Sequence, residues 1–393
     1  MDYPKVILKP KEEGRLQGGH LWAFSNEVGK LPMTAEPGMI ADLYHADKGF
    51  LGRGFYHPHS LIAFRIVTHQ KDDDINGAFL EKRLREALAL RQLLYPGQSA
   101  YRWVFGESDR LPGLIIDRYG DYLAVQIIAA GMERLIEPLT EALQSIVHPK
   151  GIVLRPDSSL RELEGLSKGA AAVVSGTVPA RVEIETENGK FGVDLLSGQK
   201  TGFYFDQRDN RQVLAALCKD RKVLDGFCYS GGFGIAAARA GAREVVFADT
   251  AKAALELASE NVERNGVRAR TGFVEGDVLK LLEHEAPGGP FEIISIDPPA
   301  FAKSKKFLPV ALKAYEKLNS GAMSALPRGG ILATSSCSHH VTRELFLEML
   351  RRAARKSRRN FRLLELRSQA KDHPSLLAMP ETEYLKFAIL QVI

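Results

Sequence analysis

The sequence predicts an α/β protein whose C-terminal half is an open, doubly wound and mainly parallel sheet of seven strands. From about residue 181, short apolar strands alternate with helical segments in the manner of βαβ units. Before about residue 70, short strands are broken by Gly and Pro, which predicts a small β-barrel. A stretch of mixed character lies between them. We therefore expect three domains: a β-barrel over 1–72, a central α+β domain over 73–180 and the doubly wound domain over 181–393.

The composition is that of an ordinary folded protein. Of 393 residues, 45% are hydrophobic and 26% are charged, which excludes disordered, collagen-like and coiled-coil chains. The longest apolar stretch, near residues 122–130, is far shorter than the roughly 20 residues of a membrane helix. The first residues contain no signal-peptide pattern, so we expect a cytoplasmic protein without a membrane partner. Three cysteines without C-x-x-C spacing predict neither disulfides nor a metal site.

The first two domains have distinct patterns. Strands of the barrel are expected at 6–10, 22–28, 38–58 and 62–68. A charged break at 72–74 precedes apolar residues at helical spacing, which predict a helix over 75–95. Further on, Gly120-Asp121 separates two apolar runs and predicts a hairpin within 111–128. A helix over 133–147 and a strand over 151–156 complete this domain.

In the third domain the predicted strands are apolar on both faces, as burial under helices on each side requires. The expected strands are 222–227, 244–249, 272–277, 291–297, 329–337, 361–367 and 385–393. The expected helices are 234–240, 251–265, 280–284, 309–325 and 342–357.

A glycine-rich turn, residues 228–234, follows the first of these strands and opens the crevice where doubly wound sheets bind nucleotides. We expect Phe227, Tyr229 and Gly231 to line the ligand there. The turn is neither G-x-G-x-x-G nor G-x-x-x-x-G-K-[ST], so neither a dinucleotide nor a P-loop is indicated.

Acidic residues stand at the ends of three successive strands. Asp249 is placed to accept hydrogen bonds from ribose hydroxyls, Asp277 from an adenine amine, and Asp225 to contact an ammonium group. Each acid alone is better explained as a helix N-cap or strand-end residue. Together they predict an adenosine ligand that carries a cation. S-adenosylmethionine has both features.

Two further strand ends carry candidate catalytic groups. Asp297 precedes two prolines that fix the backbone, which suits gripping an amine or ring nitrogen of a nucleobase. Cys337 ends the next strand. A pyrimidine can be methylated at carbon 5 only after a nucleophile adds at carbon 6, and a thiolate performs such additions. Cys228 is a competing thiol inside the glycine-rich turn, and Cys218 is expected to be an inert core residue.

Several motifs carry a resemblance to a known family. They are HLWAF at 20–24, GESDRLPGLIIDRYGDYL at 106–123, KTGFYFDQRDNR at 200–211, DGFCYSGGF at 225–233, IDPPAF at 296–301 and SSCSHH at 335–340. The chain resembles the PUA-domain-containing, class I S-adenosylmethionine-dependent 23S rRNA cytosine-5 methyltransferases. This resemblance implies a PUA-like RNA-binding barrel followed, after the central domain, by a Rossmann-like class I methyltransferase domain.

The resemblance also implies site residues and a reaction. Cys337 would attack the base of a 23S rRNA cytidine, Asp297 would hold its edge and contact the cofactor, and Phe205, Asp206 and Arg208 would flank S-adenosylmethionine. In the wider group a second cysteine follows the fourth-strand proline, whereas this chain has Ala300. The base that removes the carbon 5 proton is therefore unassigned.

Clusters of basic residues are candidates for contact with ribosomal RNA, either 23S rRNA or a large-subunit precursor. One cluster is Lys303, Lys305 and Lys306, and the other lies within 351–362 and includes Arg351, Arg355 and Arg358. A solvated helix face explains the second cluster equally well. The oligomeric state stays open, a homodimer included.

Two other functions stay open. D-P-P-x-F resembles the (D/N)-P-P-(F/Y) signature of enzymes that methylate exocyclic amines of adenine or guanine, with the aromatic residue one position late at Phe301. Cys337 would then be a spectator. The other alternative is a non-catalytic, RNA-binding ribosome assembly factor.

Overall fold

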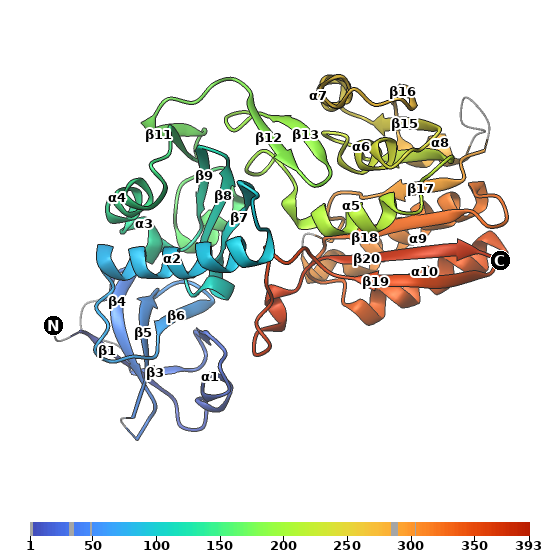
Figure 1. Ribbon diagram of the computed structural model, residues 1–393. Helices are drawn as coiled ribbons and strands as arrows, with labels where there is room; N and C mark the ends of the chain where they lie inside the picture. The colour runs from blue at the N-terminus through green and yellow to red at the C-terminus, as the bar shows by residue number, and fades with distance from the viewer. Residues whose placement is uncertain (1–2, 31–34, 48, 284–289, 303) are drawn as a thin grey trace. The chain divides into compact units, whose positions relative to one another are not determined.

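The protein forms two compact units in a computed structural model that describes residues 3–30, 35–47, 49–283, 290–302 and 304–393. Unit 1 comprises residues 1–184, 193–203 and 372–382, and unit 2 comprises 185–192, 204–371 and 383–393. The chain therefore passes between the units several times (Figure 1). Among the described helices, none has the length and apolar character needed to cross a membrane.

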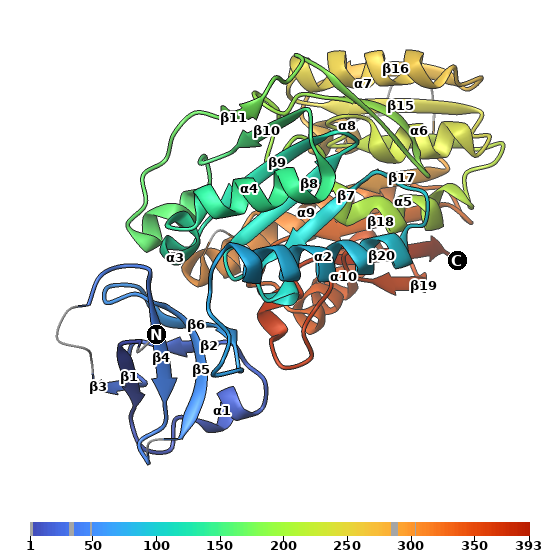
Figure 2. The same ribbon diagram turned by 60° about the vertical axis from the view of Figure 1, so that its left-hand side comes forward.

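Unit 1 begins with a mixed six-stranded sheet in the order β2-β6-β5-β4-β1-β3, seen in blue in Figure 2. Its core includes fully buried Val6, Ala41, Phe64 and Ile66. The predicted all-β character of this region is confirmed, and a single helical turn, α1 (Gly14–Gln17), accompanies the strands. The strands are β1 (Lys5–Leu8), β2 (Trp22–Phe24), β3 (Val28–Lys30), β4 (Met39–Tyr44), β5 (Phe50–Tyr56) and β6 (Ile62–Thr68).

The second sheet of unit 1 has the order β11-β10-β9-β8-β7. The predicted hairpin is confirmed, since Tyr119 and Tyr122 pair across Gly120-Asp121. Strand β7 was not predicted. The strands are β7 (Ala100–Phe105), β8 (Leu114–Tyr119), β9 (Tyr122–Ile127), β10 (Gly151–Leu154) and β11 (Ala172–Gly176), and the helices are α2 (Gly77–Leu94), α3 (Ala130–Glu133) and α4 (Ile136–Val147).

The two sheets of unit 1 share a hydrophobic core. Phe55 and Val67 of the first sheet pack in one cluster with Trp103 of the second. Polar contacts join them as well, because the indole of Trp22 donates to Glu107 at 2.8 Å and Arg65 donates to the same carboxylate at 3.0 Å. The predicted boundary near residue 72 thus falls inside one compact unit. The three-domain division stays a prediction.

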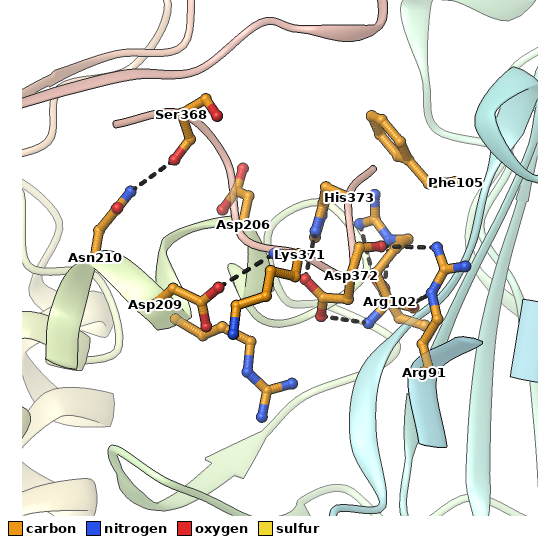
Figure 3. A network of polar contacts seen from close by, with 12 residues as sticks. Arg91, Arg102, Phe105, Asp206, Asp209, Asn210, Ser368, Lys371, Asp372 and His373 are labelled. Carbon is orange, nitrogen blue, oxygen red and sulfur yellow. Dashed lines mark hydrogen bonds and ion pairs between the residues drawn. The ribbon is translucent and has the colours of Figure 1, made fainter. Parts of the chain in front are cut away.

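The segment 372–382 returns to unit 1 from far along the chain, and buried arginines hold it there (Figure 3). The backbone N–H of Arg102 donates to Asp372 Oδ2 at 3.0 Å, and Arg91 donates to the Asp372 carbonyl at 2.8 Å. Arg91 also pairs with Asp109 at 2.5 Å. The ring of His373 lies 5.1 Å from that of Phe105.

Unit 2 contains the predicted seven-stranded sheet, in the order β16-β15-β14-β17-β18-β20-β19. Strands β14 to β18 are parallel, and β20 runs antiparallel to its neighbours β18 and β19. The doubly wound prediction is confirmed. The strands are β14 (Lys222–Gly226), β15 (Glu244–Asp249), β16 (Arg270–Glu275), β17 (Ile293–Ile296), β18 (Ile331–Ser336), β19 (Phe361–Arg367) and β20 (Lys386–Val392).

Helices cover both faces of this sheet (Figures 1 and 2). Side chains alternate between faces along a strand. On β15, Val246 and Ala248 join the cluster formed with α8, α9 and α10, whereas Phe247 lies against Gly234 of α6. The helices are α5 (Arg208–Ala215), α6 (Gly232–Arg239), α7 (Lys252–Asn265), α8 (Val278–Glu283), α9 (Leu308–Ala325) and α10 (Arg343–Ser357). Strands β12 (Val182–Thr186) and β13 (Gly189–Val193) form a separate two-stranded sheet.

A buried ion pair in unit 1 yields a stability prediction. Asp117 on β8 is fully buried and accepts hydrogen bonds from Arg102 at 2.5 and 2.9 Å and from the Thr201 hydroxyl. Asp117→Ala leaves the Arg102 guanidinium buried without its carboxylate, and we expect the free energy of unfolding to fall by about 3 to 5 kcal/mol. Urea denaturation measures the change.

Asp121 on the same hairpin is the matched control. Its carboxylate is exposed and pairs with exposed Lys150 at 2.7 Å, a pair that solvent screens. Asp121→Ala should leave the denaturation midpoint nearly unchanged. Equal losses of stability in the two variants would contradict the role assigned to burial of the Asp117 pair.

Candidate functional site

The candidate site lies along one edge of the sheet of unit 2. Parallel strands end at the same edge, where doubly wound sheets bind ligands. Asp225 is the next-to-last residue of β14, Asp249 ends β15, Asp297 follows β17 and Cys337 follows β18. Asp277 follows β16 at the same edge. The structure therefore brings together at one edge the acids and the thiol that the sequence singled out.

The turn after β14 is tight and partly strained. Phe227, Tyr229 and Gly231 adopt left-handed conformations with φ of 62°, 46° and 79°, and two of them are not glycine. Two carboxylates fix this turn: the Tyr229 N–H donates to Asp249 at 3.1 Å, and the Gly234 N–H donates to Asp225 at 2.7 Å. A Cβ on Gly234 would lie 2.2 Å from the Phe247 ring, so the helix can begin this close to β15 only with glycine there.

Asp225 is buried beneath the turn, with 2% of its surface exposed. Burial raises the pKa of its carboxyl to about 7, the Gly234 N–H and the Arg211 guanidinium act in the opposite direction, and Asp297 and Asp249 raise it further. Because burial disfavours its negative charge, the Asp225 carboxylate would be stabilised by a nearby cation. The geometry agrees with the predicted contact to an ammonium group, which stays a prediction.

Arg211 is a residue to which the sequence analysis gave no role. It is buried on α5, its guanidinium lies 5.7 Å from the ring of Phe233, and a Cβ on Gly232 would come within 2.6 Å of its Nε. Burial lowers the pKa of Arg211, whereas Asp206, Asp297 and Asp225 raise it. The guanidinium thus balances the acids of the site from within the protein. Its position at the end of KTGFYFDQRDNR was the available signal.

The carboxylate of Asp277 makes the helix-capping contact that the sequence left open as an alternative, whereas that of Asp249 contacts the residue just before α7. Asp249 also accepts from the Ala251 N–H at 3.0 Å, and Asp277 accepts from the Leu279 N–H at 2.8 Å. Asp249 is half-buried and Asp277 is exposed. Because an ionised carboxylate has about four acceptor positions, these contacts leave room for a ligand on each acid. Their ribose and adenine roles stay predictions.

The segment 204–211 contributes aromatic and charged groups beside the turn. The ring of Tyr204 meets that of Tyr229 edge-on at 5.4 Å. Burial raises the pKa of Tyr204, and Asp206, Tyr229, Asp297 and Cys337 raise it further, which places the phenol among the candidate residues. Asp206 accepts a hydrogen bond from the Tyr384 hydroxyl at 2.6 Å.

The rest of this segment is fastened inside unit 2. Arg208 is buried and donates to Glu187 at 2.5 and 2.7 Å, and Phe205 is also buried. Their predicted contact with the cofactor stays a prediction. Backbone contacts reach residues after β19, because the Lys371 N–H donates to Asp209 at 3.2 Å and Asn210 donates to the Ser368 carbonyl at 3.1 Å (Figure 3).

Cys337 is half-buried beside the loop that contains Asp297. Its Sγ lies 4.0 Å from the carbonyl oxygen of Pro298. The next residue, Ser338, has its hydroxyl 3.0 Å from that of Tyr315 and accepts from the Ala302 N–H at 3.2 Å. These contacts tie the end of β18 to the loop after β17.

The other two thiols are more deeply buried. Burial raises the pKa of Cys218 to about 12 and also raises that of Cys228. Neither thiol therefore ionises readily near neutral pH. Among the three cysteines, Cys337 is the one with solvent access at the strand-end edge.

The two basic clusters lie at different ends of unit 2. Lys305 and Lys306 are exposed just before α9, near the edge where β17 ends, and Lys303 lies outside the described residues. Arg351, Arg355 and Arg358 are exposed in and after the second half of α10. This 15-residue helix begins beside the end of β18 and runs back for roughly 22 Å, so its last turns lie toward the opposite edge.

Comparison with known families agrees with this geometry. Residues 6–69 match the PUA-like domain family, and residues 164–372 match the S-adenosylmethionine-dependent methyltransferase family. The chain belongs to the S-adenosylmethionine-dependent methyltransferases.

Relatives of this methyltransferase span its whole length. It is 40% identical over 393 residues to a Tolumonas auensis protein named ribosomal RNA large subunit methyltransferase I, with 99% of each chain covered. Identity to the protein of that name from Aeromonas hydrophila is 39% over 391 residues, with 98% of each covered. A Streptococcus mutans structure described as a SAM-dependent methyltransferase has the same fold, with a TM-score of 0.84 at 21% identity over 100% of both chains.

The donor set of the site fits S-adenosylmethionine, the cofactor of this methyltransferase family. The cofactor offers an ammonium group, a sulfonium, ribose hydroxyls and an adenine amine, and the edge offers a buried, a half-buried and an exposed carboxylate beside the glycine-rich turn. Our assignment gives the ammonium to Asp225, the ribose to Asp249 and the adenine amine to Asp277. The assignment also includes Phe227, Tyr229 and Gly231 of the turn, and the predicted contacts of Asp297, Phe205, Asp206 and Arg208 with the cofactor stay predictions.

Affinity for the cofactor should depend on pH through Asp225. Below about pH 7 its carboxyl is protonated and neutral, and above about pH 7 it is ionised and attracts an ammonium group. We therefore expect affinity to rise as pH rises through 7, by up to about tenfold per pH unit below the pKa. Calorimetric titration with S-adenosylmethionine between pH 6 and 8 measures the effect.

Asp225→Asn is the matched control, because its amide oxygen still accepts from Gly234 but does not titrate. Any pH dependence that comes from the ligand's own amine remains in this variant. A wild-type profile that parallels that of Asp225→Asn would refute the assignment.

Proposed function

We propose that this methyltransferase transfers a methyl group to carbon 5 of a cytidine in 23S ribosomal RNA, in the cytoplasm, with Cys337 as the nucleophile. The relatives named as ribosomal RNA large subunit methyltransferase I support the substrate class. The observation that carries the reaction is the position of Cys337. Its thiol is half-buried, 4.0 Å from the Pro298 carbonyl oxygen, at the edge where the cofactor acids gather.

Carbon 5 of cytosine is a weak nucleophile, and the proposed reaction activates it by adding a thiolate at carbon 6. The Cys337 thiolate forms a bond to carbon 6, and the electron pair of the 5,6 double bond moves to carbon 5. Carbon 5 then bonds to the electrophilic methyl group that bound S-adenosylmethionine would supply, and the electron pair of the broken sulfur–methyl bond would stay on the sulfur. Removal of the carbon 5 proton then restores the double bond as the Cys337 sulfur leaves. Asp297 is proposed to hold the cytosine edge, and a stacked base must first be turned out to reach this site.

Methylation of an exocyclic amine is less well supported. In that alternative the aromatic residue after the two prolines would face the base. Instead, the ring of Phe301 packs 4.5 Å from that of Tyr315, and Tyr315 belongs to the core cluster beneath the sheet. Phe301 is therefore engaged in packing. A non-catalytic assembly factor would have no use for the cofactor acids.

We also propose two RNA-contacting surfaces on unit 2. Lys305 and Lys306 lie near the catalytic edge. The second surface surrounds a cavity of about 560 Å³ beside α10, with an apolar floor that includes Leu350 and Phe361. Four arginines line it, namely Arg351, Arg355, Arg358 and Arg359. Glu348 lies 3.5 Å from Arg351 and 3.7 Å from Arg355, so one carboxylate is shared between two of these cations. The remaining positive charge suits RNA phosphates remote from the target nucleotide.

The nucleophile is tested by covalent trapping. RNA that carries 5-fluorocytidine lacks the carbon 5 proton whose loss releases the enzyme, so an adduct should accumulate on the wild type and migrate as a larger species in denaturing gels. Cys337→Ala should form no adduct and transfer no methyl group. Cys218→Ala, which removes a buried thiol away from the edge, should behave as the wild type. An adduct on Cys337→Ala would reject the assignment, and methyl transfer by that variant would favour the amine reaction.

The remote surface is tested by salt dependence. Replacing Arg351, Arg355 and Arg358 by Ala together should raise KM for ribosomal RNA and leave kcat unchanged. The slope of log affinity against log salt should fall by about 0.7 to 0.9 for each phosphate that the variant no longer neutralises, or roughly 2 to 3 in total. Lys252→Ala on α7 removes an exposed charge elsewhere and serves as the control. An unaltered slope in the triple variant would exclude this surface from RNA binding.

A further inference from the structure

A lysine is buried next to the proposed nucleophile. Lys386 begins β20, an interior strand of the sheet, and 4% of its surface is exposed. In the antiparallel register it lies opposite Ser336, the last residue of β18. Its Nζ donates to the carbonyl of Ser338 at 2.7 Å. Lys386 thus pairs with the residue before Cys337 and donates a hydrogen bond to the residue after it.

A buried ammonium group is unfavourable unless its surroundings compensate for lost hydration. The following residues of β20, Phe387 to Leu390, are all buried and apolar. Carbonyls of Ser338 and Tyr384, each 2.7 Å from Nζ, supply part of the compensation. Burial lowers the pKa of Lys386 to about 8, and Cys337 and then Glu383 raise it. Cys337 is therefore the first group that favours the charged form of this lysine.

We propose that Lys386 is a positioning residue whose ammonium group favours the thiolate form of Cys337 before the cytosine ring adds. The inference rests on the proposed function, since that function makes Cys337 the nucleophile. A thiol near neutral pH is mostly protonated, and a neighbouring cation raises the fraction that can attack carbon 6. The two carbonyl contacts fix the ammonium group at the strand end, so it does not have to be recruited from solvent.

The other groups near Cys337 differ from Lys386 in charge or in placement. Burial raises the pKa of Tyr204 and of Tyr315, so both phenols are neutral at physiological pH. Asp297 and Glu383 are acids, and a negative charge opposes thiolate formation. His339 is exposed, with its ring 5.3 Å from that of Tyr384. The guanidinium of Arg211 is shared among Asp206, Asp297 and Asp225.

The test measures alkylation of Cys337 by iodoacetamide without RNA, between pH 6 and 9.5, with the modified peptide quantified by mass spectrometry. Lys386→Met removes the charge and keeps an unbranched side chain of similar length. We expect about a tenfold slower reaction at pH 7 and a half-maximal rate displaced upward by about one pH unit, because a nearby opposite charge shifts ionisation by about one to three units. Lys386→Arg keeps the charge and should retain most of the rate.

Lys222→Met is the matched control. Lys222 is also buried on this sheet, at the start of β14, and pairs with Glu244 at 3.2 Å at the opposite edge. This variant should leave the alkylation profile unchanged. If Lys386→Met is folded, as judged by near-UV circular dichroism, and alkylates with the wild-type profile, the inference is wrong.

A second measurement uses the wild-type side chains, so it does not depend on a variant that folds. Coupling between two ionising groups is reciprocal. Blocking Cys337 with iodoacetamide removes the thiolate, and the titration of Lys386, followed by NMR with labelled lysine, should move to lower pH. An unmoved titration would overturn the inference. Methyl transfer by Cys337→Ala would instead refute the proposed function and leave this electrostatic coupling measurable.

Discussion

The parallel arrangement of β14, β15, β17 and β18 is the constraint on which the candidate site depends. Four strands that run in one direction must release their chains at one edge, so Asp225, Asp249, Asp297 and Cys337 are brought together by backbone pairing. The side chains then need only small local adjustments. Gly234 has no side chain, so α6 can pack close to Phe247 of β15. The two prolines after Asp297 keep the loop beside Cys337. The order and direction of the strands therefore determine which side chains meet at this edge.

The same edge gathers several acids in a partly dry environment, which is unfavourable unless charge is balanced. The positive charge of Arg211 offsets part of this negative charge. The N–H groups of the turn stabilise it further, as the hydrogen bond from Gly234 to Asp225 illustrates. The site keeps a surplus of acid that a cationic cofactor can relieve. At the other end of the edge the pattern is inverted, since Lys386 is the buried cation and a sulfur is its neighbour. One edge thus presents an acidic region near the ends of β14 and β15 and a buried cation beside the Cys337 thiol at the end of β18.

Much of this arrangement could be predicted from local sequence patterns. Alternation of strands and helices gave the seven-stranded sheet, and strand ends gave the acids and Cys337, because each signal lies within a few neighbouring residues. Features that depend on distant partners were missed. Arg91 meets the Asp372 carbonyl 281 residues away, and Lys386 meets Ser338 across 48 residues. In each pair, the sequence around one residue contains no pattern that indicates the other. Strand β7 and the return of 372–382 to unit 1 were missed for the same reason.

The place of β20 has a consequence for how the chain folds as it is made. This strand lies between β18 and β19 although it follows both in the sequence. A nascent chain emerging from a ribosome therefore exposes the flank of β18, including apolar Ile331 and Leu332, until β20 is translated. Among the described strands, β19 pairs with β20 alone, so it has no neighbouring strand to join before that moment. Cys337 is thus synthesised before Lys386, and the pairing of β18 with β20 is completed only once β20 has been translated.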